Sequence, residues 1–260
     1  MPKGLLCELH AHTTWSDGDL GVRELVDVYG GAGFDVLAVT DHVVRADDPY
    51  RLDDANRSVE PGDFAAYLAE LEREAARALE RYGLLLLPGV ELTLEDSDPT
   101  LAAHAVAVGL RTFVGLEDGL DAALTRARDE GAALIAAHPY TPAASRRSLR
   151  GTARFAVEPE WAAGVVDRFE LCNRHDFFPW VAEARLPAVA TGDFHRLEHL
   201  ATWKTVIDVE KTADAVLDFL RSPRPVELRL VERPLTPEPA FGANCDLTVP
   251  LQARHARALA

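Results

Sequence analysis

The stretch LLCELHAHTTWSDG, residues 5–18, decides how the rest of the chain is interpreted. It starts as a short apolar run and then passes into His10 and His12. Residues two apart in an extended segment lie on the same face, so both imidazoles can reach one ion. Asp17 follows in a Ser-Asp-Gly sequence, where glycine permits a tight turn. Imidazoles and carboxylates are ligands of divalent metals, so the stretch predicts a strand that ends at a metal site.

Four more strand-like runs end in the same kinds of residue. These residues are Asp41 and His42 after residues 34–40, Glu91 after 84–90, His138 after 132–137, and Asp193 with His195 after 188–191. In α/β barrels the active site lies just past the carboxyl ends of successive strands. Five such strand ends together indicate a multinuclear metallohydrolase.

Helix-like runs alternate with the strand-like ones. Apolar residues keep helical spacing within residues 22–29, 64–79, 116–127 and 213–220, and further strands are expected at 105–108, 165–171 and 205–209. This alternation predicts a parallel sheet with right-handed crossovers. Ligands at many strand ends favour a closed barrel over a doubly wound open sheet, which binds mainly at one switch point. No GxGxxG or P-loop pattern follows a strand, so a nucleotide-binding fold is not indicated.

Two polar, arginine-bearing segments, residues 43–60 and 139–160, are predicted to be long functional loops. Residues 233–260 hold four prolines and little periodicity. We therefore expect one barrel domain over residues 1–232 and a C-terminal tail, residues 233–260, packed on it.

The composition is that of a globular protein: 260 residues, 48% hydrophobic and 27% charged, enough for one large core or two small ones. The formal net charge of −15 should repel long polyanions, so we expect no extensive nucleic-acid binding. Bound divalent cations would reverse the sign of the charge locally.

Cysteine use and hydropathy indicate the compartment. There are three cysteines and no CxxC pair, which fits a reducing cytosol and argues against a disulfide framework or a Cys-rich zinc module. The first residues become polar too quickly for a signal peptide, and no apolar run approaches the roughly 18 residues of a membrane helix. We expect a cytoplasmic protein that does not associate with membranes.

The motifs, taken in order, resemble those of the PHP (polymerase and histidinol phosphatase) family of metal-dependent phosphoesterases. The matching segments after residue 42 are PGVE at 88–91, His104 opening an apolar run, AHP at 137–139, ELCN at 170–173 and DFH at 193–195. The resemblance covers residues 5–210 and leaves the tail out. It implies a distorted (β/α)7 TIM-like barrel with two or three divalent ions, either zinc, manganese or iron.

The resemblance also implies a ligand for each ion. The implied ligands are His10, His12, Glu91 and Asp193 for the first ion, Glu91 as a bridge with His104 and His138 for the second, and Asp17, His42 and His195 for the third. Asp41 would orient an imidazole from behind. His104 differs from the other ligands because it starts its apolar run instead of ending it.

The chain departs from the family pattern in two places. The last motif of the family usually reads Gly-Ser-Asp-x-His, whereas residues 191–195 read Thr-Gly-Asp-Phe-His, so the pocket floor is expected to differ. Trp15 stands in the 10–18 turn where smaller residues are common, and it would narrow the pocket or supply a stacking face.

Two nearby ions can bridge a water and lower its pKa from about 15.7 toward 7, and they take up charge that develops on phosphate oxygens. What remains is a phosphate clamp, for which arginine suits best. The cationic candidates are Arg45, Arg51, Arg57, Arg146, Arg147, Arg196 and Lys204, with Arg146, Arg147 and Arg196 first because their loops follow ligand-bearing segments. Asn173 would donate to the substrate or to water.

We expect Asp193, His195 and His175 to be the catalytic residues, with His175 as a candidate general acid. The remaining notable residues are interpreted as structural: His199 and His255 on the surface, Glu170 anchoring its strand, Cys7 and Cys172 as core thiols, and Trp161, Trp180 and Trp203 as packing residues.

These observations predict a hydrolase of small phosphoesters that uses a metal-bridged hydroxide. It would be a phosphomonoesterase or phosphodiesterase for a nucleotide, a sugar phosphate or an amino-alcohol phosphate. An exonuclease for short oligonucleotides is the alternative within enzymes, although basic residues are not interleaved with aromatic ones. A non-catalytic metal-binding or partner-docking domain is the alternative of another class.

Overall fold

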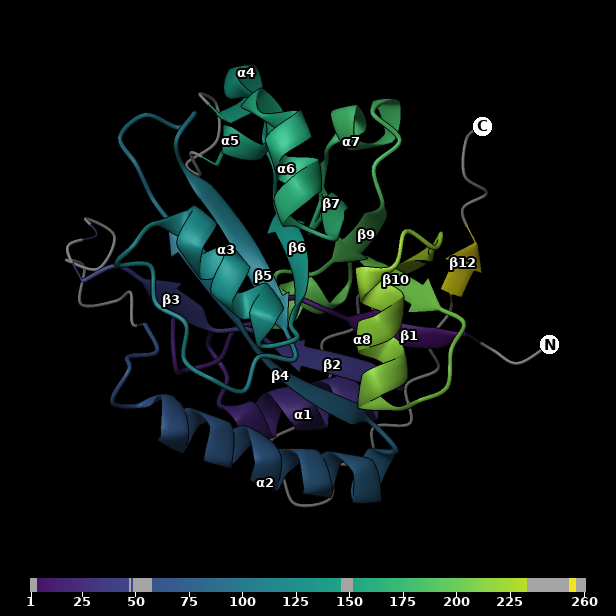
Figure 1. Ribbon diagram of the computed structural model, residues 1–260. Helices are drawn as coiled ribbons and strands as arrows, with labels where there is room; N and C mark the ends of the chain where they lie inside the picture. Colours follow the sequence, from purple (N-terminus) through teal and green to yellow (C-terminus); the bar gives the residue numbers. More distant parts are fainter. Residues whose placement is uncertain (1–3, 47, 49–57, 146–151, 233–252, 256–260) are drawn as a thin grey trace.

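In the described part of the chain, twelve strands form one connected sheet at the centre, and helices cover its outside (Figure 1). The computed structural model describes residues 4–46, 48, 58–145, 152–232 and 253–255. The strands are β1 (Leu5–Glu8), β2 (Val36–Val39), β3 (His42–Val44), β4 (Leu85–Leu94), β5 (Ala103–Val108), β6 (Ala133–Ala137), β7 (Arg168–Asn173), β8 (Asp176–Phe177), β9 (Ala188–Thr191), β10 (Trp203–Ile207), β11 (Glu227–Val231) and β12 (Ala253–His255).

The helices of the described chain lie between these strands. They are α1 (Val22–Gly31), α2 (Phe64–Tyr82), α3 (Leu120–Asp129), α4 (Pro142–Ser145), α5 (Arg154–Val157), α6 (Pro159–Val165), α7 (Pro179–Glu183), α8 (Ala213–Arg221) and the 3-10 helix η2 (Leu197–Leu200). The helices expected from periodicity are present, although α3 starts four residues later than the apolar spacing predicts. None of the described helices combines the length and apolar character that spanning a bilayer demands.

The sheet curls back toward its own start. The strands run in the order β1-β2-β4-β5-β6-β7, and β9 pairs with β7. Shortly after β9, Phe194 forms a bridge to Ala11. Two hydrogen bonds hold it, from His12 N to Phe194 O (2.8 Å) and from Phe194 N to His10 O (3.1 Å). The chain segments that follow β1 and β9 therefore lie side by side, which brings the first and last predicted ligand motifs together.

The mixed α/β class and the curled sheet agree with the sequence prediction, but a regular (β/α)7 barrel is not confirmed. β5 is antiparallel to both β4 and β6, and β10 is antiparallel to β1. Residues 95–102 join β4 to β5, whereas a parallel crossover needs roughly a dozen residues or more, so the chain turns straight back. The division into residues 1–232 and a tail stays a prediction, because most of the tail lies outside the described residues.

Two boundaries predicted from the sequence are wrong. β4 does not end at Glu91 but continues to Leu94, because β3 and β5 pair with its second half. The predicted 43–60 loop begins inside β3, which starts at His42. The 139–160 segment contains α4, α5 and the start of α6. Residues 146–151 between α4 and α5 lie outside the described chain.

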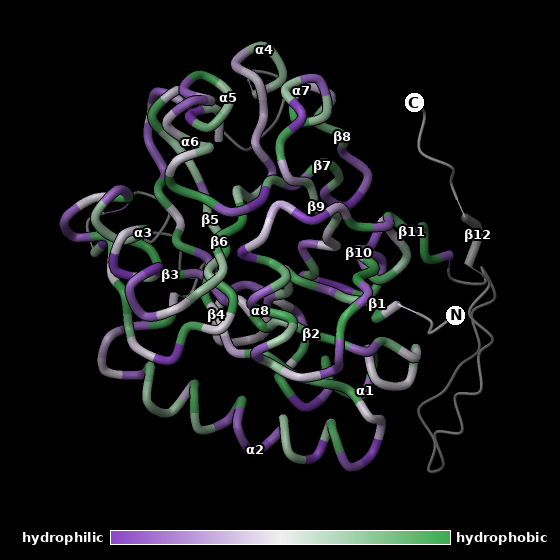
Figure 2. The backbone as a smooth tube through the Cα atoms, turned by 45° about the vertical axis from the view of Figure 1, so that its right-hand side comes forward, coloured by the Kyte–Doolittle hydropathy of each residue, from purple (hydrophilic) through white to green (hydrophobic). Residues whose placement is uncertain are grey.

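Two apolar clusters hold the fold together. Inside the curl, Leu5, Val36 and Ile135 pack with Phe219 and Leu220 of α8. Outside it, the helices α1 and α2 cover the sheet, and hydrophilic and hydrophobic residues alternate along α2 as an amphipathic helix requires (Figure 2). The strands are thus buried on both faces.

Arg168 fastens β7 to the end of α8. It is fully buried, and its guanidinium donates to the carbonyl oxygens of Leu220 (2.9 Å), Phe219 (3.0 Å), Ser222 (2.6 Å) and Arg224 (2.9 Å). The last carbonyls of a helix have no partner within the helix, so this side chain satisfies them.

Replacing this clamp should cost the fold much of its stability. We expect Arg168→Met to lower the free energy of unfolding by about 3–5 kcal/mol, because several charge-assisted hydrogen bonds are lost and buried carbonyls are left without donors. Urea denaturation followed by circular dichroism measures the change. Arg73→Met on the exposed side of α2 is the control, expected to stay within about 0.5 kcal/mol of wild type. Similar losses for both variants would contradict this role of Arg168.

Candidate metal centre

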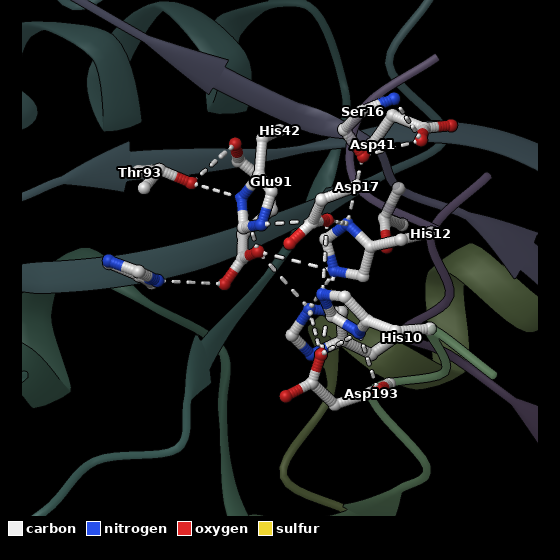
Figure 3. A network of polar contacts seen from close by, with 12 residues as sticks. His10, His12, Ser16, Asp17, Asp41, His42, Glu91, Thr93 and Asp193 are labelled. Atoms are coloured by element: carbon white, nitrogen blue, oxygen red, sulfur yellow. Dashed lines mark hydrogen bonds and ion pairs between the residues drawn. The ribbon is translucent and has the colours of Figure 1, made fainter. Parts of the chain in front are cut away.

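Side chains from six different strands and turns meet in one buried group. Within the described chain, three overlapping sets of side chains have ligand atoms within 4.8 Å of one another. The first set is His10, His12 and Glu91, the second is Glu91, His104 and His138, and the third is His12, Asp17, His42 and His195. Figure 3 shows the labelled imidazoles and Asp17 directed toward Glu91. All of these residues were singled out from the sequence, and Glu91 lies between two of the sets.

Asp193 completes the first set from the opposite side. Its Oδ1 lies 3.7 Å from His10 Nε2 and 3.5 Å from His12 Nε2. His12 also belongs to the set around Asp17, a position that the resemblance assigned to the first ion alone. The imidazole of His12 therefore stands between two prospective ion positions.

The donor atoms fit a group of divalent cations. Glu91 Oε2 is buried and lies 2.9 Å from His42 Nδ1. The same oxygen lies 3.4 Å from His10 Nε2 and 3.3 Å from His12 Nε2. These two Nε2 atoms are 3.0 Å apart. Unprotonated nitrogens and carboxylate oxygens at such distances repel one another, and a proton or a metal cation between them removes the repulsion. Nitrogen and carboxylate oxygen are donors that suit zinc, manganese and iron.

His10 is oriented by Glu170. His10 Nδ1 lies 2.9 Å from Glu170 Oε1, which leaves Nε2 to face the cluster. The same carboxylate accepts hydrogen bonds from His138 N (2.6 Å) and Thr191 Oγ1 (2.6 Å). The sequence interpretation of Glu170 as a strand anchor missed its contact with a ligand. The sequence did offer a signal for this contact: Glu170 lies near the end of a predicted strand, as the predicted ligands do.

Asp41 supports His12 as expected, although it acts through a serine. It accepts hydrogen bonds from Thr13 N (2.7 Å) and Ser16 Oγ (2.7 Å), and Ser16 Oγ lies 3.3 Å from His12 Nδ1. The Asp41 carboxyl is fully buried, and burial raises its pKa.

Two side chains that the sequence did not reveal, Thr152 and Glu95, contact the imidazoles of the prospective second ion position. His138 Nδ1 lies 3.2 Å from Thr152 Oγ1, and its Nε2 lies 3.2 Å from Glu91 Oε1. His104 lies between Glu91 (3.1 Å from Nδ1) and Glu95 (2.9 Å from Nε2). Burial opposes a charge on this imidazole, but the two carboxylates raise the pKa of His104 to about 9.

The pKa values of Glu91 and Asp17 are both lowered, so these two carboxylates stay ionised. Burial alone would raise the pKa of Glu91, but the imidazoles around it, His42 first, hold it well below its usual value. Burial likewise opposes ionisation of Asp17, and the hydrogen bond with His195 lowers its pKa. Anionic oxygens next to imidazole nitrogens are the electrostatic environment that a divalent cation requires.

The backbone is strained where it carries this site. His138 (φ 30°), Arg174 (φ 52°) and Asp193 (φ 43°) have positive φ values, which non-glycine residues rarely adopt. Such conformations persist only where the surrounding structure imposes them. The strain therefore coincides with two prospective ligands and with the arginine beside them.

A cavity of about 700 Å³ opens above the centre. The residues that line it include the hydrogen-bond donors Arg174, Arg196 and His199, and also Asp19, Glu95, Asp96 and Ser97. Arg196 was predicted as a clamp residue, and it does line the cavity. Arg174 was not predicted. Its Nε donates to Asp193 O (2.9 Å), and its Nη2 lies 2.7 Å from His195 Nδ1.

The structure places His199 differently from the surface position predicted for it. Its side chain is 8% exposed and lines the cavity, because the short helix η2 turns it inward. His199 Nδ1 accepts a hydrogen bond from His195 N (3.1 Å), so a proton on the neutral ring sits on Nε2. Burial, with Arg174 next, lowers the pKa of His199 to about 3.

This shift predicts a pH dependence of the metal-free protein. The folded pKa of about 3 lies below the unfolded value of 6.5, so the unfolded state binds more protons between them, and stability falls as pH decreases below 6.5. We expect His199→Gln to remove about 1 kcal/mol of the stability difference between pH 7.5 and pH 5.5. Urea titrations in chelator at both pH values measure it. An unchanged pH dependence in the variant would contradict a depressed pKa.

Several other predicted site residues lie elsewhere. Lys204 is fully buried against Glu8, 2.6 Å away, and is no phosphate clamp. Asn173 is buried and donates to Glu170 Oε2 (2.7 Å), so its amide is already engaged. His175 is exposed in the turn between β7 and β8 and does not line the cavity. Arg45 is half-buried outside the cavity wall. The predicted Arg51, Arg57, Arg146 and Arg147 lie outside the described residues.

Trp15 neither narrows the cavity nor offers a stacking face to it. Its ring packs edge-on against Tyr67, with centroids 5.5 Å apart, and its Nε1 donates to Glu70 (2.9 Å). The indole therefore joins the 10–18 turn to α2. Cys7 and Cys172 are buried thiols, as expected.

Comparison with known proteins places the fold. No family model matches the chain, and no curated protein matches it. A solved two-domain protein from Bacteroides vulgatus, described as containing a predicted PHP-like metal-dependent phosphoesterase, superposes with a TM-score of 0.60 and 22% identity over 86% of this chain. The match spans 64% of that structure's chain.

Two further structures are more distant. A candidate metal-dependent phosphoesterase from Bifidobacterium adolescentis has a TM-score of 0.44 and 19% identity, and an amidohydrolase from Chromobacterium violaceum has a TM-score of 0.47 and 16% identity. Each match covers 73% of this chain and 87% of the other. The first of the three similarities shows that this protein has a PHP-like fold, which agrees with the family that its motifs resemble.

Proposed function

We propose that this protein is a metal-dependent hydrolase of small phosphoesters, acting as a phosphomonoesterase or phosphodiesterase. The observation that supports it best is the position of Glu91. Its Oε2 faces His10 and His12, while its Oε1 faces His104 and His138. One carboxylate between two sets of imidazoles suits a bridge between two ions.

The proposed ligands follow from this arrangement. His10, His12, Glu91 and Asp193 would hold the first ion, Glu91, His104 and His138 the second, and Asp17, His42 and His195 the third. Bound divalent ions lower the pKa of a coordinated water and take up the charge that develops on phosphoryl oxygens. Zinc, manganese and iron all suit these donors, and elemental analysis of the purified protein identifies the native ion.

The donor side of the cavity would hold the substrate phosphate. Arg174 is fixed by its contacts with Asp193 O and with Asp193 Oδ2 (3.2 Å), so its guanidinium is already oriented. Arg196 and His199 line the same cavity. His199 would donate from Nε2 as a neutral ring, since its Nδ1 is engaged by His195 N. Prearranged donors of this kind lose little freedom when an oxyanion binds.

The cavity wall also favours a small substrate. A volume of about 700 Å³ lies in the range of small-molecule sites and would admit a nucleotide or sugar phosphate. Asp19, Glu95 and Asp96 at the wall would repel the backbone of a long polyanion. His175, being exposed and outside the wall, is not retained as general acid.

A substrate screen on protein of measured metal content tests the proposal. The panel holds nucleoside monophosphates, sugar phosphates, amino-alcohol phosphates, a generic phosphodiester and labelled short RNA and DNA. Metal-dependent turnover of a small phosphoester is expected. Shortening of oligonucleotides without turnover of small esters would favour the exonuclease alternative. Bound metal with no turnover anywhere would favour a non-catalytic domain.

The clamp assignment gives a separate expectation. Arg196→Met should raise KM for the phosphoester about tenfold with a smaller change in kcat, because one charged hydrogen bond to phosphate is worth roughly 1.5–3 kcal/mol. Steady-state kinetics measures both constants, and Arg73→Met serves as the matched control. An unchanged KM would remove Arg196 from the clamp.

A further inference from the structure

A fully buried ion pair lies beneath the prospective ligands. Lys204 Nζ is 2.6 Å from Glu8 Oε2, and both side chains are 0% exposed. Burying two charges costs several kcal/mol per ion before their attraction is counted, and an apolar pair of similar volume is often as stable. Stability alone therefore gives little reason for this pair, and its other contacts need an explanation.

Glu8 holds the main chain of two ligand segments. Its Oε1 accepts hydrogen bonds from Gly192 N (2.9 Å), Leu9 N (3.1 Å) and His10 N (3.2 Å). Tyr29 OH donates to its other oxygen (2.9 Å). One carboxylate thus fixes the chain that leads into His10 relative to the chain that leads into Asp193.

Lys204 holds a third segment. Its Nζ donates to His199 O (3.1 Å) and to Thr202 Oγ1 (2.7 Å). Since His199 Nδ1 in turn accepts from His195 N, the position of the ammonium group also bears on the 193–199 segment. Three cavity-forming segments from distant parts of the sequence therefore converge on one ion pair.

Gly192 is the residue that makes space for the pair. A Cβ at this position would lie 2.2 Å from Lys204 Nζ and 2.4 Å from Glu8 Oε2. A Cβ at residue 192 would push the ammonium and the carboxylate out of their present positions, so the pair as observed requires glycine here. The family motif has serine at the position of Gly192, and in this chain glycine at that position leaves room for the Glu8–Lys204 pair.

We propose that the Glu8–Lys204 pair is a positioning device for the first metal position, which sets the separation of His10 from Asp193. The inference rests on the metal centre of the proposed function. The pair touches no substrate. It acts through main-chain hydrogen bonds, and groups that support ligands in this way typically change metal affinity by 10–100-fold when removed.

Two double variants separate positioning from stability. Glu8→Leu with Lys204→Met replaces the pair by apolar side chains and removes the acceptor for His10 N and Gly192 N. Glu8→Gln with Lys204→Met also removes both charges but keeps an amide oxygen for the same two N–H groups. Manganese affinity is measured by calorimetry, bound metal by elemental analysis, and folding by thermal denaturation in chelator.

We expect the leucine variant to bind manganese at least tenfold more weakly and to lose one equivalent of bound metal. Its midpoint in chelator should fall, because Gly192 N, His10 N and Tyr29 OH lose their acceptor, so affinity is measured at a temperature where the variant is folded. The glutamine variant should bind manganese close to wild type. A control pair, Arg77→Met with Asp27→Asn, removes the α1–α2 ion pair and should leave metal affinity unchanged.

Wild-type affinity and stoichiometry in the folded leucine variant would overturn the proposal. Should that variant not fold, Gly192→Ala gives the answer, because its Cβ displaces the pair, and unchanged manganese affinity there also overturns the proposal. These readouts need no turnover. A wild-type protein that binds metal but hydrolyses nothing would therefore defeat the proposed function and leave this inference intact.

Discussion

Glu91→Gln is expected to lower kcat/KM of the metal-loaded protein about 1,000-fold, a loss of roughly 4 kcal/mol of transition-state stabilisation. The change keeps the shape of the side chain but removes the negative charge that two sets of imidazoles share. We expect bound metal to fall by at least one equivalent. Steady-state kinetics on the most active substrate of the screen, with elemental analysis of the same sample, measures both effects.

Glu95→Gln is the matched control for this variant. Glu95 contacts His104 Nε2 from the rim of the cavity and lies apart from His10 and His12. We therefore expect its loss to reduce kcat/KM by about tenfold at most, in line with side chains that only support a ligand. Equal losses in the two variants would show that Glu91 is not a bridge.

Metal loading is expected to stabilise the fold strongly. Ligand that binds only the folded state at 1,000 times its Kd adds about 4 kcal/mol, and for a domain of this size that corresponds to roughly 10 °C in Tm. Manganese should therefore raise the melting temperature of chelator-treated protein by that amount. The converging lone pairs around Glu91 are the physical reason, because a cation replaces their repulsion with attraction.

Scanning calorimetry with and without manganese tests this expectation, with magnesium as the comparison ion, since magnesium binds imidazole poorly. Asp17→Asn should keep most of the stabilisation, because Asp17 belongs to the set around His195 and not to the two sets that share Glu91. Equal melting temperatures with and without manganese would contradict a metal centre at these residues.

The ligand residues could be predicted because their signal is local. His10 and His12 follow a buried strand, and the two-residue period of a strand fixes which way both rings point. The same holds for Asp41, His42 and His138, which follow short apolar runs. Such patterns are visible in one sequence without knowledge of what packs against them.

The pairing of distant strands could not be predicted, and the error over Lys204 shows why. In the antiparallel pair of β1 and β10, Cys7 lies opposite Thr205, so Glu8 and Lys204 are the next neighbours in register. The alternation of strands and helices predicts only parallel neighbours for β1, and that prediction does not place Glu8 opposite Lys204. With its partner unknown, a lysine near ligand motifs was assigned to phosphate binding.

Arg174 and His199 escaped prediction for a related reason. The side chain of Arg174 reaches the site because its backbone adopts φ 52°, and His199 faces inward because of the turn that η2 makes. Neither conformation has a periodic pattern in the sequence. The predicted clamp arginines lie mostly in the two charged segments, residues 43–60 and 139–160. Most arginines of these segments are outside the described chain.

The position of Glu91 inside β4 has a consequence for how such a site can diversify. Glu91 is paired with His42 of β3 on one side and with Val106 of β5 on the other, so its main chain is held by a ladder in both directions. Arg174 and Arg196 lie in turns, and His199 lies in the short helix η2 that follows one of them. Turn residues can be exchanged or inserted with little effect on a sheet. Substitutions or insertions in the turns can therefore change which substrate binds, while Glu91 keeps its position in the sheet.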